Sequence, residues 1–254
     1  MVVMDDPEPY RTATTVDEFR RNLTDVQARI ERAAKDVGRD PTEIRLLPVS
    51  KTVPEHRIRL AYAAGATVLG ENKVQEAVRK ARALEDLSIE WALIGHLQTN
   101  KAKEVARYAS EFHALDSPRV AEALDRRLQA LGRGLDVFVQ VNTSAETSKF
   151  GLRPDDVADF VAGLPAYASL RVRGLMTLAE FTTDIERVRA CFRRLRDLRD
   201  RLRDSAPDGV RLDELSMGMS GDYEVAIAEG ATTVRVGQAI FGPRATPDSA
   251  YWPT

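Results

Sequence analysis

The sequence contains one cysteine and three histidines, and this scarcity excludes several kinds of site. A single cysteine, Cys191, can form neither an intramolecular disulfide nor a cysteine-based zinc site. The histidines, His56, His96 and His113, do not have the paired spacing of metal ligands. Neither His56 nor His113 has an evident nucleophile beside it, so the sequence does not support a hydrolase triad.

The chain also lacks a long apolar run and an excess of charge of either sign. No apolar run approaches the length of about 18 residues that spans a bilayer, and the acidic, proline-bearing start is not a secretory signal. The 37 lysines and arginines nearly balance the 39 aspartates and glutamates, which does not favour a general nucleic-acid-binding surface. We therefore expect a cytoplasmic protein that binds no nucleic acid and no membrane.

What the sequence does contain is an alternation of short apolar runs with segments of helical periodicity. Eight apolar, often β-branched runs have the character of strands that are covered on both faces. These runs are Ile44–Val49, Thr67–Leu69, Ile89–Ile94, Phe112–Leu115, Leu135–Val141, Leu170–Leu175, Leu212–Met217 and Thr233–Val236. Between them lie helical segments such as Asp184–Asp204, where apolar residues three or four apart mark one buried stripe that includes Cys191. An extra helix, Val16–Val37, precedes the first strand and opens on a capping box at Thr15 and Glu18.

This alternation predicts a barrel of parallel strands. Parallel neighbours need a crossover helix between them, and eight repeats in 254 residues favour a closed (β/α)₈ TIM barrel over an open doubly wound sheet. We expect one barrel domain at residues 15–245, a disordered N-terminal tail at 1–14 and a C-terminal tail at 246–254. Pro48 does not fit this pattern, because proline inside a strand removes a hydrogen-bond donor from the ladder.

Lys51 is the first candidate site residue, because functional groups of such barrels lie at the carboxyl ends of the strands. It directly follows the first strand and shares a face with Val49 and Leu47, so its side chain should point into the barrel mouth. Partial desolvation favours the neutral amine, the form that attacks a carbonyl in Schiff-base chemistry. A lysine that reaches solvent or pairs with Glu71 is the alternative interpretation.

The segment Ser216–Gly221 is the second candidate, because its small residues lead into a helical pattern at Asp222–Glu229. A helix N-terminus has free amide donors that bind anions, and barrels often bind phosphate with the loops after strands seven and eight. Gly237, after the eighth strand, would let a second stretch of backbone approach the same anion. Arg235 faces the same side as Gly237 and should contact either a ligand or a structural partner. An ordinary capped helix remains the alternative to a phosphate site.

Several segments of the chain together match one known family. They are Leu47–Thr52, Gly70–Glu76, Ile94–Lys101, Gln140–Asn142, Ser148–Lys149, Arg173–Met176, Leu215–Ser220 and Val234–Gly242. With these motifs the chain resembles the pyridoxal 5′-phosphate homeostasis proteins, single-domain relatives of the alanine racemase N-terminal barrel, from Val16 to Arg244. Two segments depart from the family pattern: the chain has Trp91-Ala92-Leu93-Ile94-Gly95 where the family usually has Trp-His-Phe-Ile-Gly, and Pro48 replaces the usual small residue.

The resemblance implies a role for each candidate residue. The implied cofactor-binding residues are Lys51, Asn72, Ser216, Met217, Gly218, Met219, Ser220, Arg235 and Gly237. Lys51 would form the internal aldimine with the aldehyde of pyridoxal 5′-phosphate (PLP), and Asn72 would line the ring pocket. The two serines and the backbone amides would hold the phosphate, and Arg235 would face the pyridine nitrogen. Arginine does not give up a proton, so the ring would be a weaker electron sink than a protonated pyridinium.

Two classes of function fit such a site. A carrier, which is not an enzyme, would hold PLP as a lysine Schiff base, limit free aldehyde and supply the cofactor to apo PLP-dependent enzymes. A PLP-dependent racemase needs a second acid/base group, which two-domain racemases take from an additional β domain for which the stretch after Gly242 is too short. A Schiff-base aldolase acting on a sugar phosphate is a more distant alternative. We expect the carrier, as a monomer, in PLP homeostasis.

Overall fold

The structure is a computed structural model that describes residues 10–144, 146 and 150–243. The expected C-terminal tail, most of the expected N-terminal tail and the Ser148–Lys149 motif lie outside these residues. Within the described part of the chain, no helix combines the length and the apolar character that crossing a membrane requires.

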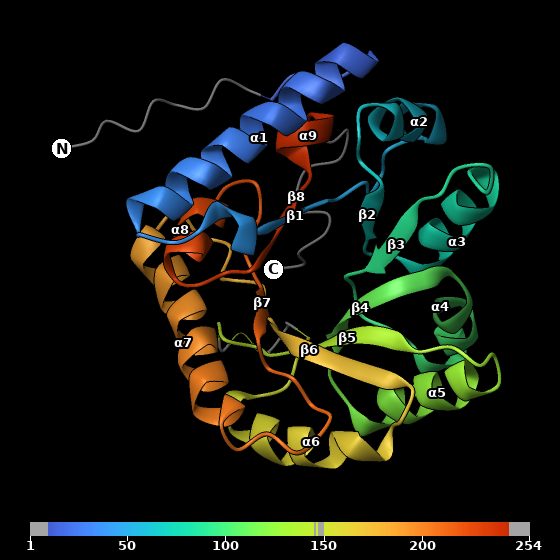
Figure 1. The fold of residues 1–254 in the computed structure, drawn as a ribbon, viewed down its shortest axis with the longest axis vertical. Helices are drawn as coiled ribbons and strands as arrows, with labels where there is room; N and C mark the ends of the chain where they lie inside the picture. The colour runs from blue at the N-terminus through green and yellow to red at the C-terminus, as the bar shows by residue number, and fades with distance from the viewer. Residues whose placement is uncertain (1–9, 145, 147–149, 244–254) are drawn as a thin grey trace.

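Eight parallel strands form a nearly closed barrel at the centre of the molecule (Figure 1). They are β1 (Arg45–Pro48), β2 (Val68–Glu71), β3 (Glu90–Leu93), β4 (Ala109–Leu115), β5 (Leu135–Gln140), β6 (Leu170–Met176), β7 (Glu214–Ser216) and β8 (Thr233–Val236). The ladder runs β1-β8-β7-β6-β5-β4-β3-β2, so the first and last strands of the chain are neighbours. The predicted TIM barrel is confirmed, and each of the eight predicted runs overlaps one of these strands.

A helix follows every strand and covers the outside of the barrel (Figure 1). The helices are α1 (Val16–Asp36), α2 (Glu55–Ala63), α3 (Val74–Ala83), α4 (Ala102–Tyr108), α5 (Pro118–Gln129), α6 (Val157–Gly163), α7 (Ile185–Arg203), α8 (Tyr223–Ala228) and α9 (Gln238–Phe241). The extra helix α1 begins with the expected capping box, in which Thr15 Oγ1 accepts the Glu18 amide at 3.3 Å. Cys191 is buried on α7, as its place in the apolar stripe predicted.

The barrel ladder is open between β1 and β2, and this opening explains Pro48. The Val49 amide donates to Val236 of β8 at 2.8 Å, whereas the Ser50 amide donates to Gly70 of β2 at 3.0 Å. Successive amides of a strand point to opposite neighbours, so position 48 faces β2. On that side an isolated bridge between Val49 and Gly70 takes the place of a ladder. The proline therefore removes a donor where the described residues form no regular ladder.

Residues 10–14, which we expected in the disordered tail, lie against the barrel. The Ala13 side chain is buried, and its carbonyl accepts a hydrogen bond from Arg57 Nε at 2.9 Å. Tyr10 Oη donates to the carbonyl of Ser220 at 3.2 Å. These contacts join segments far apart in the sequence, so the composition of the N-terminus gave no sign of them. The packed domain thus extends to Tyr10, beyond the boundary that we expected at Thr15.

Candidate functional site

The carboxyl ends of β1 and β8 bring Lys51 close to Gly237. Val49 pairs with the end of β8 through its amide, and a Cβ placed on Gly237 would lie 3.1 Å from the Val49 carbonyl oxygen. Lys51 follows Val49 by two residues and is half-buried in the turn after β1. The amine and the glycine that we predicted in one site therefore come from adjoining strand ends.

Asn72 reaches the same neighbourhood from β2. The Gly70 carbonyl accepts the Ser50 amide at 3.0 Å, so the chain beyond β2 lies beside the turn that carries Lys51. Asn72 is half-buried, and its backbone packs so closely on Gly95 that a Cβ there would lie 2.1 Å from the Asn72 carbonyl oxygen. The glycine after β3 is thus required for this approach of the two strand ends.

The loop after β7 packs against the end of β8. Ser220 Oγ accepts the Gly237 amide at 3.2 Å, and the Gly218 carbonyl accepts the Arg235 amide at 3.0 Å. Gly218 has a φ of 95°, and a Cβ added to it would lie 2.7 Å from Cβ of Ala226 in α8. Both the positive φ and the close approach of α8 demand glycine at this position.

Backbone amides without an acceptor gather where α8 and α9 begin. No described acceptor takes the amide protons of Gly218, Ser220 and Gly221, or that of Gln238 at the start of α9. The other amides that we predicted for an anion are used within the fold. Those of Met217, Met219 and Gly237 donate to the Thr233 carbonyl, to Asp222 Oδ1 and to Ser220 Oγ respectively. An anion here would therefore meet a different set of amides from the one expected.

Arg235 is buried, with 3% of its surface exposed. Its Nη1 donates to Ser216 Oγ and its Nη2 to the Thr177 carbonyl, each at 2.8 Å, and it forms no ion pair with a described carboxylate. Burial lowers the pKa of Arg235 to about 10, although the charge of Asp222 opposes this shift. The guanidinium thus stays charged at neutral pH, and a buried cation without a paired anion suits a ligand with an electron-rich acceptor.

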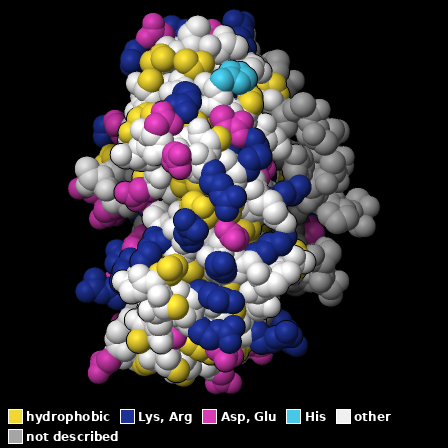
Figure 2. All heavy atoms as spheres, turned by 90° about the vertical axis from the view of Figure 1, so that its right-hand side faces the viewer, with side chains coloured by type: hydrophobic (Ala, Val, Ile, Leu, Met, Phe, Trp, Pro, Cys, Tyr) yellow, Lys and Arg dark blue, Asp and Glu magenta, His cyan; other side chains and the backbone are white. Residues whose placement is uncertain are grey.

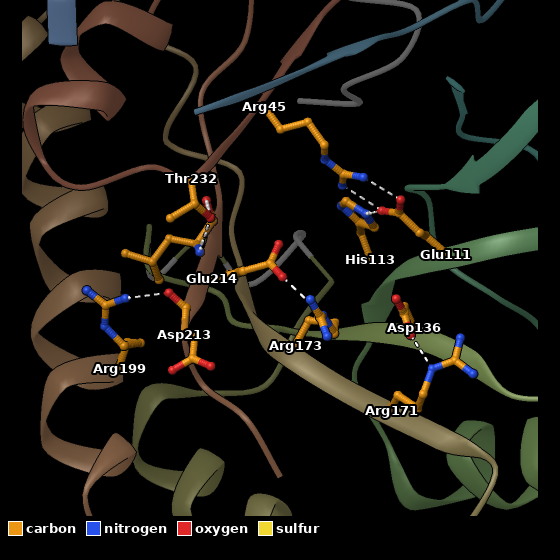
Figure 3. Close-up of polar contacts among 11 residues, drawn as sticks. Arg45, Glu111, His113, Asp136, Arg171, Arg173, Arg199, Asp213, Glu214 and Thr232 are labelled. Carbon is orange, nitrogen blue, oxygen red and sulfur yellow. Dashed lines mark hydrogen bonds and ion pairs between the residues drawn. The ribbon is translucent and has the colours of Figure 1, made fainter. Parts of the chain in front are cut away.

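A chain of hydrogen bonds continues from Arg235 through the barrel interior. Ser216 Oγ lies 2.9 Å from His113 Nδ1, and His113 Nε2 lies 2.8 Å from Glu111 Oε2. Figure 3 shows Arg45 closing this chain, with a hydrogen bond of 2.6 Å from Nη2 to the same carboxylate oxygen. Burial alone would raise the pKa of Glu111, but hydrogen bonds from Arg45 and His113 outweigh it and hold that pKa well below its usual range.

The direction of these bonds follows from the donors and acceptors available. The Glu111 carboxylate only accepts, so we assign the His113 proton to Nε2, which leaves Nδ1 to accept the hydroxyl proton of Ser216. Ser216 Oγ then accepts from Arg235 and donates to His113. The Ser216 side chain thus contacts Arg235 and His113, both buried inside the barrel.

The neutral His113 predicts a pH dependence of stability. Burial lowers the pKa of His113 from its ordinary value of 6.5, so the unfolded chain takes up a proton that the folded chain does not. The free energy of unfolding should therefore fall as the pH drops below about 6.5, by up to about 1.4 kcal/mol per pH unit. Urea unfolding between pH 7.5 and pH 5.5 measures this dependence, which the His113→Gln variant should lack.

The exposed His56 provides the matched control for this measurement. His56→Gln should retain the pH dependence of the wild type, because it leaves the buried His113 and its hydrogen-bond partners unchanged. Equal pH dependence in the wild type and in His113→Gln would contradict the assignment of a neutral His113. Glu111 does not interfere in this range, because its depressed pKa removes stability only at more acidic pH.

Sequence reasoning missed three residues that support Arg235. They are Thr177, His113 and Glu111. His113 and Glu111 stand two apart in β4, so both point into the barrel. The available signal was therefore a pair of polar residues on the face of the strand that also carries Ala109 and Leu115. Thr177 contributes its carbonyl oxygen, which no side-chain pattern can reveal.

Two hollows lie away from this site. One, of about 680 Å³, lies between α3 and α4 on the face shown in Figure 2, where many lysine and arginine side chains gather. Its Arg79 pairs with Glu55, and its Arg82 donates to Tyr108 Oη at 3.1 Å. The other, of about 350 Å³, opens at the amino end of the barrel and is bordered by ion pairs. These pairs are Arg45–Glu111, Arg173–Glu214 and Arg171–Asp136 (Figure 3).

Comparison with known proteins places this TIM barrel among the alanine racemase N-terminal domains. A family model described as "Alanine racemase, N-terminal domain" matches residues 16–245. The chain is 43% identical over 223 residues to the pyridoxal phosphate homeostasis protein of Pseudomonas aeruginosa, a match that covers 88% of this chain and 94% of that protein. The chain belongs to the pyridoxal phosphate homeostasis protein family, as its motifs suggested.

Solved structures support the same grouping. PipY of Synechococcus elongatus, in its structure with PLP bound, is 36% identical to the chain, with a TM-score of 0.77. That match covers 88% of this chain and all of the PipY chain. An alanine racemase of Clostridium difficile shares the fold, with a TM-score of 0.70 at 14% identity, and the match covers 96% of this chain but only 61% of the racemase.

Proposed function

We propose that this chain binds PLP reversibly at the carboxyl end of the barrel and buffers or supplies it, as a monomer. PLP presents an aldehyde, a phosphate and a pyridine nitrogen at three places on one small molecule. The proposal is supported by the order of the strands: β8, which carries the buried Arg235, lies between β1, which leads into Lys51, and β7, which leads into the loop with amides that no described residue accepts. These groups fit the three parts of PLP by charge and by hydrogen-bonding capacity.

The unused amides at the starts of α8 and α9 would hold the phosphate. Gly218, Ser220, Gly221 and Gln238 each offer an N–H group that no described residue accepts. Ser220 Oγ lies among them, and it tethers the two loops through its bond to the Gly237 amide. Amide donors at helix N-termini stabilise a dianion without adding side-chain charge.

Arg235 would donate to the pyridine nitrogen. Ser216 and Thr177 already accept two of its N–H groups, so the plane of the guanidinium is fixed before a ligand arrives. PLP supplies an aldehyde that condenses with a primary amine and a ring that can withdraw electrons. Because Arg235 remains protonated at neutral pH, it donates a hydrogen bond and does not protonate the ring, which limits the chemistry available to a bound amino acid.

Lys51 would provide the amine for the covalent link, and Asn72 would contact the ring from β2. Lys51 is half-buried, so a small aldehyde can reach its side chain. We further propose that the chain is a carrier that delivers PLP to apo PLP-dependent enzymes and that it does not catalyse a reaction of amino acids. The absence of racemisation by the purified, PLP-loaded chain would agree with this, and turnover abolished by Lys51→Ala would overturn it.

The direct test is an absorption titration of the apo chain with PLP. Formation of the covalent link should produce a yellow species, and borohydride should fix it with one PLP per chain. Peptide mapping of the reduced chain should then find the adduct in the peptide that contains Lys51. Binding without a reducible adduct, or an adduct on another lysine, would refute this assignment.

A further inference from the structure

The residue that follows Lys51 has a backbone conformation that is rare for its type. Thr52 has a φ of 65°, and among the described residues it is the one non-glycine residue with a positive φ. The left-handed region is unfavourable for residues with a side chain, because Cβ crowds the following carbonyl group. Such strain persists only where surrounding contacts enforce it.

The strained residue belongs to a tight turn that carries Lys51. The Val53 amide donates to the Ser50 carbonyl at 3.0 Å, which closes a four-residue turn with Lys51 second and Thr52 third. A positive φ at the third residue is a feature of type II turns, in which that residue is usually glycine. Threonine stands here instead, so contacts from outside the turn must hold it.

Two residues of α3 provide these contacts, one on each side of Lys51. The Thr52 amide donates to Glu76 Oε1 at 2.8 Å, and Lys80 Nζ donates to the Ser50 carbonyl at 2.7 Å. Glu76 and Lys80 are one helical turn apart and form an ion pair at 2.7 Å. The backbone on both sides of Lys51 is thus fixed to α3.

Burial makes this arrangement costly to disturb. Lys80 is fully buried, and besides Glu76 and Ser50 it donates to Glu71 Oε1 at 2.7 Å. Glu71 is also fully buried and accepts a second hydrogen bond of 2.6 Å from Ser50 Oγ. A buried ammonium is stable only while such partners remain in place, so the position of Ser50 is strongly constrained.

We propose that Glu76 and Lys80 are positioning residues that direct the Lys51 amine toward its ligand by holding Thr52 in the left-handed conformation. The inference rests on the proposed binding of PLP at Lys51, where amine and aldehyde condense with loss of one water. If the Glu76 contact is removed, Thr52 relaxes to a negative φ. The side chain of the preceding residue then changes direction, because both belong to one turn.

The rate of adduct formation between PLP and the apo chain tests this role. Glu76→Ala should slow the reaction about tenfold, in line with the free-energy cost of left-handed backbone for a non-glycine residue. Glu76→Gln keeps an acceptor oxygen for the Thr52 amide and should react at nearly the wild-type rate. Glu104→Ala, a half-buried glutamate in the first turn of the neighbouring α4, is the matched control and should also react normally.

A second substitution separates positioning from general stability. Glycine adopts a positive φ without strain, so Thr52→Gly in the Glu76→Ala background should restore most of the lost rate. A merely structural role of Glu76 would not be rescued by a change at Thr52. Wild-type kinetics of Glu76→Ala, or a double variant as slow as Glu76→Ala, would overturn the proposal.

A probe that does not depend on PLP distinguishes failure of this inference from failure of the proposed function. Trinitrobenzenesulfonate modifies exposed amines, and peptide mapping gives its rate at Lys51 in the apo chain. That rate should change in Glu76→Ala and return toward the wild-type value when Thr52 is also glycine. If wild-type Lys51 forms no adduct with PLP, the proposed function fails, and the labelling rates still decide whether Glu76 positions Lys51.

Discussion

Replacement of Lys51 by alanine should abolish the borohydride-reducible adduct with PLP. The methyl side chain has no amine, whereas Arg235 and the loop amides that we propose hold the phosphate belong to other strand ends and stay in place. The variant should therefore still bind PLP without a covalent bond, and more weakly than the wild type. Absorption spectra with and without borohydride, followed by mass spectrometry of the intact chain, measure both effects.

Other lysines provide the controls for this result. Lys80 lies nearby, but its three N–H groups donate to Ser50, Glu71 and Glu76, so it is held in an ion-pair network. Lys103→Ala removes an exposed lysine of α4 and should leave the adduct unchanged. A reducible adduct of unchanged amount in Lys51→Ala would show that another amine carries the cofactor.

Substitution of Gly218 by alanine should weaken both the fold and the phosphate site. The φ of 95° is unfavourable for alanine, and the new Cβ would lie 2.7 Å from Cβ of Ala226 and 2.9 Å from Cα of Tyr223. Backbone strain and overpacking together should lower the free energy of unfolding by about 3 kcal/mol. The loop can relieve the clash only by moving away from α8, and this would displace the amides of Gly218 and Ser220. We expect the affinity for PLP to fall at least about tenfold, which titration of the apo variant measures.

Gly230 is a control that separates backbone strain from overpacking. It has nearly the same positive φ as Gly218, but no atom crowds it. Its φ is 97°, and a Cβ there would have its nearest neighbour, Cδ of Arg196, at 3.6 Å. Gly230→Ala should lower the free energy of unfolding by about 1 kcal/mol through strain alone and leave PLP affinity unchanged. If Gly218→Ala binds PLP with unaltered affinity, this loop does not hold the phosphate.

The fold could be predicted from the sequence because the strands are short, apolar and regularly separated by helices. The largest error in a strand boundary was in β4, which begins at Ala109 and not at Phe112. The charged residue Glu111 interrupts the apolar run, and its partner Arg45 stands on β1, far away in the chain. A charge that is neutralised by a distant strand has the same appearance in a sequence as a charge in a loop.

The site was less predictable for a related reason. Ser216 has the sequence surroundings of a phosphate ligand, yet its hydroxyl contacts Arg235 and His113, which come from β8 and β4. Lys80 occurs in an amphipathic helix, where lysine usually faces solvent, but three acceptors hold it in the interior. In both cases the side-chain direction depends on partners that only the closed barrel brings together.

The hydrogen-bonded chain from Arg235 to Arg45 links the two ends of the barrel. The hydrogen bonds therefore couple the amino end to Arg235, even though that end touches no proposed ligand group. A substitution at Arg45 should loosen Glu111, then the His113 ring and the Ser216 hydroxyl, and finally the Arg235 guanidinium, which we propose contacts the ligand. Sequence divergence among such barrels should accordingly be restrained along this internal axis and free on the helices around it.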